Sequence, residues 1–126
     1  MNLNQVTVPS QDVSESILFY KNLGLKLIVH THERYARFEC PKGDSTFSIH
    51  QVDNKPSGDV FVYFEVDDVW TTVEKLKSKG VAFETDVLEQ SWLWTEARLK
   101  DPDGNSIIIF HAGDDRKNPP WRILDE

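Results

Sequence analysis

The feature that most constrains the fold of this chain is an internal repeat. Segments 36–50 and 97–111 share Ala, Arg, Pro, Gly, Ser and His at matching positions, with a constant offset of 61 (97 − 36 and 111 − 50). In both copies a Pro-x-Gly turn precedes an apolar, β-branched run that is typical of a buried strand. A repeat is sought first because missing one misassigns the whole fold.

The elements around the two turns follow one another in the same order. Alternating and β-branched residues predict first-half strands at 3–8, 25–29, 35–40 and 46–52, with a helix at 14–23. After the turn-rich linker 53–59, the order restarts with a strand at 61–66 and a helix at 69–79. The helix units Asp12 to Gly24 and Asp68 to Gly80 are offset by 56 (68 − 12), so the second half gains five residues before Ala97.

These patterns predict a single α+β domain over residues 1–126, built from two tandem βαβββ units. The units span about 3–52 and 60–112, and a polar C-terminal arm covers 113–126. Within the arm, Pro119-Pro120-Trp121 excludes a regular helix or a central strand. This run predicts either an arm that docks on its own or a partner surface, or a free end.

The composition narrows the classes of partner. A net charge of −7 opposes binding to nucleic acid and to anionic membrane surfaces. No apolar stretch approaches the ~18 residues of a membrane span, and the first residues lack the layout of a signal peptide. One cysteine, Cys40, excludes an internal disulfide and a cysteine-based zinc cluster. We therefore expect a cytoplasmic protein.

Several stretches resemble one known family. They are 5–13, 19–20, 23–25, 64–69 and 76–81, together with the turn Asp101-Pro102-Asp103-Gly104-Asn105. In this arrangement the chain resembles the vicinal oxygen chelate superfamily, which groups glyoxalases, bleomycin-resistance proteins and extradiol dioxygenases. The resemblance implies a curved mixed sheet with helices on the convex side, a ligand cavity on the concave side, and a homodimer.

The resemblance also implies a divalent metal held by the first and last strands of each unit. Gln5 suits the first of these four positions, but Phe61 and Ile108 have no donor atoms. The fourth position falls at Phe47 or, if the turn is one residue longer, at Ser48. We therefore expect no standard metal site and no cofactor. Zinc, nickel or iron remains possible only through a non-standard site built on Gln5, His50 and a glutamate.

Strand alternation selects the side chains that line the implied cavity. Phe47 and Ile49 suit the helix-packed side, which directs Ser48 and His50 to the opposite face; a register error of one residue would reverse this. The same reasoning predicts these ligand-binding residues: Gln5, Tyr35, Arg37, Ser48, Tyr63, Glu65, Trp92, Trp94 and Arg98. Trp92 and Trp94 alternate around Leu93, so we expect both on one side, as a cavity wall or as a helix or dimer contact.

The two repeated arginines have two interpretations. Arg37 and Arg98 either pair with glutamates such as Glu39, Glu96 or Glu65 and fix the sheet, or one of them clamps a carboxylate or phosphonate. His50 is the candidate for acid–base catalysis, because imidazole exchanges protons at physiological pH. A hydrogen-bonded structural role is the alternative for this histidine.

The residues and the resemblance together predict two alternative functions. The first is a small-molecule binding protein of the bleomycin-resistance kind without the standard metal site. The second is a glyoxalase-like lyase, isomerase or dioxygenase that uses a non-standard metal site or His50. A purely interacting role for the Pro119-Pro120-Trp121 arm ranks last.

Overall fold

The computed structural model describes residues 1–124, so the last two positions of the predicted arm lie outside the described residues. Contacts divide the chain into two compact units. Unit 1 contains Met1–Phe61 and Lys100–Ser106, and unit 2 contains Val62–Leu99 and the chain from Ile107 onward. Within residues 1–124, no helix has both the length and the apolar character needed to cross a membrane.

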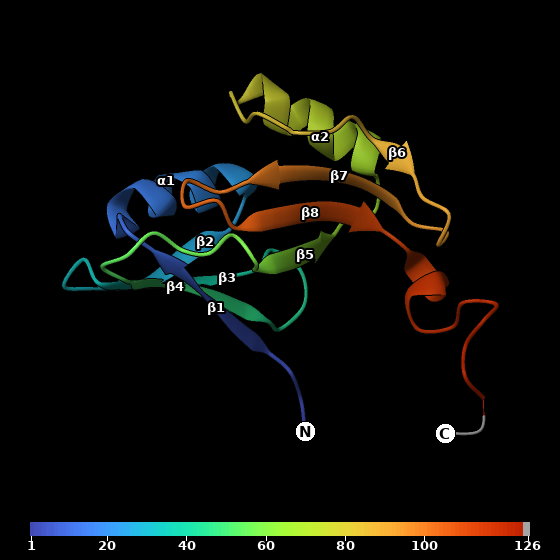
Figure 1. Ribbon diagram of the computed structural model, residues 1–126, viewed down its shortest axis with the longest axis horizontal. Helices are drawn as coiled ribbons and strands as arrows, with labels where there is room; N and C mark the ends of the chain where they lie inside the picture. The colour runs from blue at the N-terminus through green and yellow to red at the C-terminus, as the bar shows by residue number, and fades with distance from the viewer. Residues whose placement is uncertain (125–126) are drawn as a thin grey trace. The chain divides into compact units, whose positions relative to one another are not determined.

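Each half of the chain forms a four-stranded mixed sheet and one helix (Figure 1). The first half contains β1 (Gln5–Ser10), α1 (Val13–Leu23), β2 (Lys26–Thr31), β3 (Tyr35–Glu39) and β4 (Thr46–Gln51), with sheet order β1-β4-β3-β2. The second half contains β5 (Phe61–Glu65), α2 (Val69–Ser78), β6 (Leu88–Glu89), β7 (Thr95–Lys100) and β8 (Ser106–His111), with order β5-β8-β7-β6. A 3₁₀ helix, η1 (Gly113–Arg116), follows. The predicted α+β fold of two βαβββ units is confirmed.

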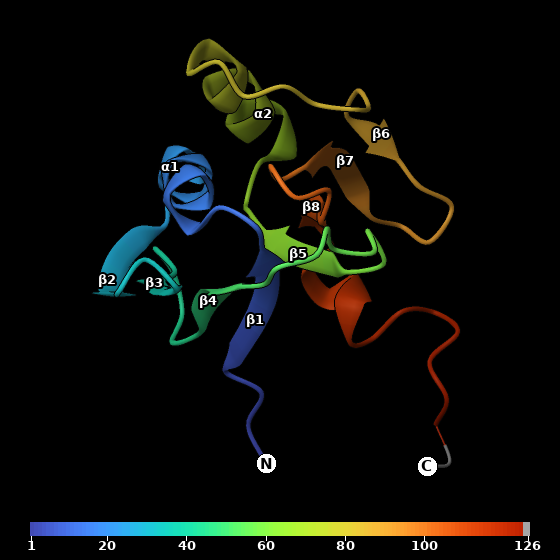
Figure 2. The same cartoon turned by 60° about the vertical axis from the view of Figure 1, so that its left-hand side comes forward.

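Helix α1 covers one face of the first sheet. It begins where the Asp12 side chain accepts a hydrogen bond from the Glu15 backbone N–H, and it ends at Gly24, whose φ of 108° is left-handed. The helix contacts β2, β3 and β4 and lies on one side of them (Figure 2). The Tyr20 ring packs 4.6 Å from the Phe47 ring, centroid to centroid, which places the core of unit 1 between α1 and its sheet.

Helix α2 repeats this design in unit 2. The Asp68 side chain caps the helix by accepting from the Thr71 backbone N–H. Its buried residues Val69, Val73 and Leu76 follow the spacing of one helix face. Figures 1 and 2 both show α2 on one side of β7 and β8.

The turn 101–105 joins β7 to β8 but belongs to unit 1 by its contacts, and we call it the clasp. Asp101 is 5% exposed, and its Oδ1 accepts hydrogen bonds from the backbone N–H groups of Asp103 and Asn105. Its Oδ2 accepts from the Tyr20 hydroxyl at 2.6 Å and from Asn105 Nδ2 at 2.8 Å. Asn105 Nδ2 also donates to the Pro9 carbonyl at 3.1 Å. These bonds therefore hold residues 101–105 against β1 and α1 within unit 1.

Asp103 completes the clasp at the start of α1. Its Oδ1 accepts from the Gln11 backbone N–H at 2.7 Å, and its Oδ2 accepts from the Ser16 hydroxyl at 3.0 Å. The corresponding first-half turn has Lys42 and Asp44 at the positions of Asp103 and Asn105, and residues 41–45 are exposed. Only the second turn therefore carries the side chains that make these buried contacts.

The structure corrects several predicted boundaries. The second strand, predicted at 25–29, is β2 at Lys26–Thr31, and the first strand, predicted at 3–8, begins at Gln5. The prediction ended the first strand at Val8, but β1 continues through Pro9 to Ser10. Within its sheet β1 is an edge strand that pairs only with β4. Proline is compatible with an edge strand because one side of such a strand has no neighbour that needs an N–H donor.

The structure also corrects the offset after the repeated turn. The Cys40 backbone N–H bonds to the Ser45 carbonyl, whereas the Asp101 N–H bonds to the Asn105 carbonyl, so the first-half turn is one residue longer. The last strands begin at Thr46 and Ser106, an offset of 60 (106 − 46) rather than 61. His50 therefore corresponds to Phe110 and not to His111.

Candidate functional site

One face of the first sheet is polar, as strand alternation predicts. Ala36, Phe38, Phe47 and Ile49 are buried on the side of α1. The opposite side carries the residues that we call the polar face: Gln5, Thr7, Tyr35, Arg37, Ser48 and His50. Strand pairing aligns Thr7 with Ser48 and Ser48 with Arg37, so these side chains form one row across β1, β4 and β3.

Hydrogen bonds link members of the polar face. The Thr7 and Ser48 hydroxyl oxygens lie 2.5 Å apart, and Arg37 Nε donates to the Tyr35 hydroxyl at 2.9 Å. The Arg37 guanidinium carbon also lies 5.4 Å from the centre of the Tyr35 ring. Gln5 Oε1 accepts from the Thr46 hydroxyl at 2.8 Å, a neighbour that sequence reasoning did not single out.

The phenol of Tyr35 is electrostatically perturbed. Partial burial alone raises its pKa, but hydrogen bonds with Arg37, Ser48 and Gln5 and the positive charge of Arg37 outweigh that effect. The net result is a pKa below the ordinary value of 10.0. His50 is exposed and aligns with Tyr35 across the β3–β4 pair. A catalytic role for His50 stays a prediction.

The second half places an ion pair where the first half has Tyr35 and Arg37. Arg98 Nε lies 2.9 Å from Glu96 Oε2, and Glu96 is only 2% exposed. The Arg98 backbone N–H donates to the Thr85 hydroxyl at 3.0 Å, a contact that no sequence pattern indicated. Arg98 thus has the internal glutamate partner that one of the two interpretations predicts.

Three aromatic rings stack on the second sheet. Trp94 lies parallel to Phe110, with centroids 4.6 Å apart and an interplanar angle of 20°, and Tyr63 meets both rings edge-on. Trp92 instead lies in the turn before β7, where Leu93 has a φ of 70°. Because residues 91–92 form a turn, strand alternation does not decide whether Trp92 and Trp94 face the same side, and that expectation stays a prediction.

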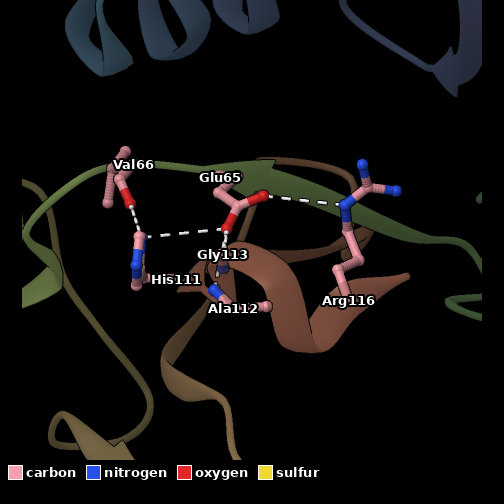
Figure 3. A network of polar contacts seen from close by, with 6 residues as sticks. All are labelled: Glu65, Val66, His111, Ala112, Gly113 and Arg116. Carbon is pink, nitrogen blue, oxygen red and sulfur yellow. Dashed lines mark hydrogen bonds and ion pairs between the residues drawn. The ribbon is translucent and has the colours of Figure 1, made fainter. Parts of the chain in front are cut away.

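Glu65 anchors the chain that follows β8 (Figure 3). Its Oε2 accepts hydrogen bonds from the backbone N–H groups of Ala112 at 2.7 Å and Gly113 at 2.9 Å. His111 Nδ1 and Arg116 Nε each lie 3.7 Å from a carboxylate oxygen of Glu65. These contacts occupy the carboxylate, and a ligand-binding role for Glu65 stays a prediction. Beyond η1, Trp121 is 58% exposed, so its predicted docking on a surface also stays a prediction.

Three of the four implied metal positions hold residues that do not fit a divalent ion, and Gln5 is the exception. The corrected offset makes Ser48 the counterpart of Ile108 (108 − 60), which decides between the two alternatives for the fourth position. Ser48 contributes a neutral hydroxyl already bonded to Thr7, while Phe61 and Ile108 contribute no donor atom. Within residues 1–124, no three His, Cys, Asp or Glu side chains gather closely enough to share a metal ion.

Comparison with solved structures shows the same architecture in several proteins. A glyoxalase/bleomycin resistance protein/dioxygenase from Nocardioides superimposes with a TM-score of 0.78 at 18% identity, covering 98% of this chain and 90% of that one. Lactoylglutathione lyase from Agrobacterium tumefaciens gives 0.74 at 14% identity, with 97% of each chain covered. A bleomycin-binding protein in complex with bleomycin gives 0.71 at 21% identity, covering 88% of this chain and 98% of that one.

These identities are low enough that the structural comparisons establish the fold alone. No curated protein sequence matches the chain significantly. The family model for the Glyoxalase/Bleomycin resistance protein/Dioxygenase superfamily matches residues 2–109, which is most of the sequence. The chain therefore belongs to the glyoxalase/bleomycin resistance protein/dioxygenase superfamily.

Proposed function

We propose that this protein binds a small molecule on the polar face of unit 1, without a metal held at the four standard positions. The observation that carries the proposal is the row of hydrogen-bonding side chains formed by Thr7, Ser48 and Arg37 across three paired strands. Ligand sites combine a few placed polar groups with apolar walls, and paired strands hold such groups rigidly. We also propose that a cavity encloses the ligand.

The fold relatives support binding as the function. One of them was solved with bleomycin bound, so this fold accommodates a small molecule in at least that protein. In the present chain Tyr63, Trp94 and Phe110 form an aromatic cluster in unit 2, in which Tyr63 is 47% exposed and Phe110 is buried. Such a cluster suits an aromatic or flat ligand.

The test is a screen of charged and neutral aromatic fragments by two-dimensional amide NMR. The proposal expects saturable shift changes at amides of the polar face, near residues 5–7, 35–37 and 46–50. Ser48→Ala should weaken binding, while Ser91→Ala, in an exposed turn outside the polar face, should leave it unchanged. Fragments that bind only elsewhere, or not at all, would refute the proposal.

An enzyme remains the second candidate, because His50 is exposed beside Tyr35, whose pKa is lowered. This pair could move a proton on a bound ligand. The discriminating measurement is the metal content of the purified protein, followed by the melting shift on adding zinc, nickel or iron(II). Stoichiometric metal that is lost in His50→Ala would favour the enzyme over metal-free binding.

We further propose a homodimer and a cytoplasmic location, which the family resemblance and the sequence suggest. Sedimentation velocity across a concentration series tests the first proposal. Fractionation of cells that express the protein tests the second.

A further inference from the structure

The two repeated arginines have different partners at equivalent positions. Tyr35 and Arg37 correspond to Glu96 and Arg98 with the same offset of 61 (96 − 35 and 98 − 37). In each pair the arginine Nε donates to the side-chain oxygen two residues earlier at 2.9 Å. The geometry is conserved between the halves, but a neutral phenol has the place of a carboxylate in the first half.

This difference leaves the charge of Arg37 uncompensated. Among residues 1–124, Tyr35 is the hydrogen-bond partner of its guanidinium, and no carboxylate forms an ion pair with it. Glu39 lies on the same face of β3, but it pairs with Lys26 at 3.6 Å.

The neighbouring strands supply no anion either. On β2 the residue aligned with Arg37 is Val29, on β4 it is Ser48, and the β1 side chains in reach of this row are Gln5 and Thr7. His50, which aligns with Tyr35, is a further titratable group on this face, and its imidazole carries either no charge or a positive one.

We propose that Arg37 binds the oxyanion of a small ligand, a carboxylate or a phosphonate or phosphate group, and that Tyr35 determines this specificity. The proposal rests on the proposed small-molecule function and names the chemical class of its ligand. Tyr35 orients the guanidinium through Nε but adds no negative charge.

The guanidinium group of Arg37, a planar fork of N–H groups, has the hydrogen-bond donors that this role needs. A guanidinium carries five N–H groups, and Tyr35 takes the single one on Nε. The four N–H groups on the two terminal nitrogens remain for a bidentate contact with an oxyanion. In the same row the Thr7 side chain is exposed and offers a further hydroxyl, while the Ser48 hydroxyl is buried and bonded to Thr7. In unit 2, Glu96 neutralises the equivalent fork, so Arg98 does not bind an anion.

Benzoate and benzamide form a suitable pair of probes because they share a shape and differ in charge, and phenylphosphonate distinguishes the two kinds of oxyanion. Calorimetric or NMR titration should show wild-type protein binding benzoate or phenylphosphonate about tenfold or more tightly than benzamide. Arg37→Gln and Tyr35→Glu should each remove this preference. Tyr35→Phe, which keeps the charge of Arg37, and the matched control Arg98→Gln should retain it.

The outcomes separate this inference from the proposed function. If benzamide binds as tightly as benzoate and Arg37→Gln changes neither affinity, the anion site is wrong while small-molecule binding stands. If neither benzoate, phenylphosphonate nor benzamide binds the polar face, both are wrong. Circular dichroism and the melting temperature of each variant confirm that a loss of binding is not a loss of fold.

A pH series adds a readout that a merely structural role of Tyr35 would not change. Ionised Tyr35 supplies the negative charge that Glu96 supplies in the second half, so benzoate affinity should fall as Tyr35 ionises, and this fall should begin at a lower pH than the ionisation of an ordinary tyrosine because the pKa of Tyr35 is lowered. The fall should disappear in Tyr35→Phe. It should persist in His50→Gln, which excludes the imidazole as its origin. An equal fall in wild type and Tyr35→Phe would overturn the assignment of Tyr35.

Discussion

At the scale of single residues, two tyrosines of unit 1 have opposite electrostatic environments. Tyr20 is fully buried, and its hydroxyl donates a hydrogen bond to Asp101. The pKa of Tyr20 is raised far above the ordinary value, mainly because the side chain is buried and next because the charge of Asp101 is close. Tyr35 sits beside Arg37, and its pKa is lowered. The same side-chain type is therefore held neutral in the core and ionises more readily than an ordinary tyrosine on the polar face.

As the pH rises, Tyr35 should ionise before Tyr20, because the pKa of Tyr35 is lowered and that of Tyr20 is raised. Because the pKa of Tyr20 is higher in the folded than in the unfolded protein, its contribution to stability is complete below about pH 10 and is lost as the pH rises above that value. We expect phenolate absorbance from Tyr35 first, and from Tyr20 only as the protein unfolds. Tyr35→Phe should remove the earliest step. Ionisation of Tyr20 in a protein with native circular dichroism would contradict this prediction.

Removing the buried hydroxyl of Tyr20 should lower the stability of the protein. Tyr20→Phe leaves Asp101 Oδ2 with one donor fewer in a buried site, and we expect a loss of about 1–3 kcal/mol in the free energy of unfolding, measured by urea denaturation. Tyr63→Phe is the matched control, because Tyr63 is half-exposed and should cost much less. Equal effects in the two variants would show that the Tyr20–Asp101 bond is not stabilising.

Sequence reasoning at this scale predicted the face that a side chain occupies better than it predicted the partners of that side chain. Alternation placed Tyr35, Arg37, Ser48 and His50 on one face, because buried apolar neighbours set the register of each strand. It left open whether either arginine pairs with a glutamate, since rotamers and cross-strand contacts decide that. The repeat did align Tyr35 with Glu96, and this difference in charge was the available signal.

At the scale of elements, Glu65 joins β5 to the segment that ends in η1 (Figure 3). A carboxylate that accepts two backbone N–H groups at the start of a helical turn stabilises that turn and satisfies its free donors. The side chain of Arg116, in the last turn of η1, approaches the same carboxylate.

Removal of this carboxylate should loosen the segment locally. In Glu65→Ala we expect faster hydrogen exchange at the amides of Ala112 and Gly113, because their acceptor is gone, with little change at the amides of β3 and β4. Glu74→Ala, an exposed position on α2, serves as the control. Unchanged exchange at Ala112 and Gly113 in Glu65→Ala would contradict the anchoring role.

Elements were predictable where local signals and burial agree. Helix α1 begins at the N-cap Asp12 and ends at the left-handed residue Gly24. Both residue types indicate these roles from the sequence alone. The prediction ended β1 too early because proline usually ends a strand. Pro9 is tolerated within β1 because β1 is an edge strand. The turn around Leu93 was missed because its positive φ occurs without glycine.

At the scale of the whole molecule, the clasp makes unit 1 depend on residues from both halves of the sequence. The turn 101–105 is joined directly to β7 and β8, yet its carboxylates accept hydrogen bonds from α1 and from Gln11 just before it. The side-chain amide of Asn105 donates to the Pro9 carbonyl of β1. The repeat predicted two equivalent turns. Their difference lies in Asp101, Asp103 and Asn105, whose polar side chains have buried partners in unit 1.

This dependence predicts a single unfolding transition. Asp103→Ala removes the acceptor of the Gln11 amide and the Ser16 hydroxyl, both in unit 1, and should cost about 2 kcal/mol. All four tryptophans lie in unit 2, at positions 70, 92, 94 and 121. Tryptophan fluorescence therefore reports unit 2, while far-ultraviolet circular dichroism reports both units.

In urea we expect Asp103→Ala to lower the fluorescence and dichroism midpoints by the same amount, because unit 1 cannot unfold without releasing a turn continuous with β7 and β8. Asp44→Ala, in the exposed first-half turn, should shift neither midpoint appreciably. A dichroism transition that splits while the fluorescence midpoint stays in place would show that the two units unfold independently. The clasp would then stabilise unit 1 alone.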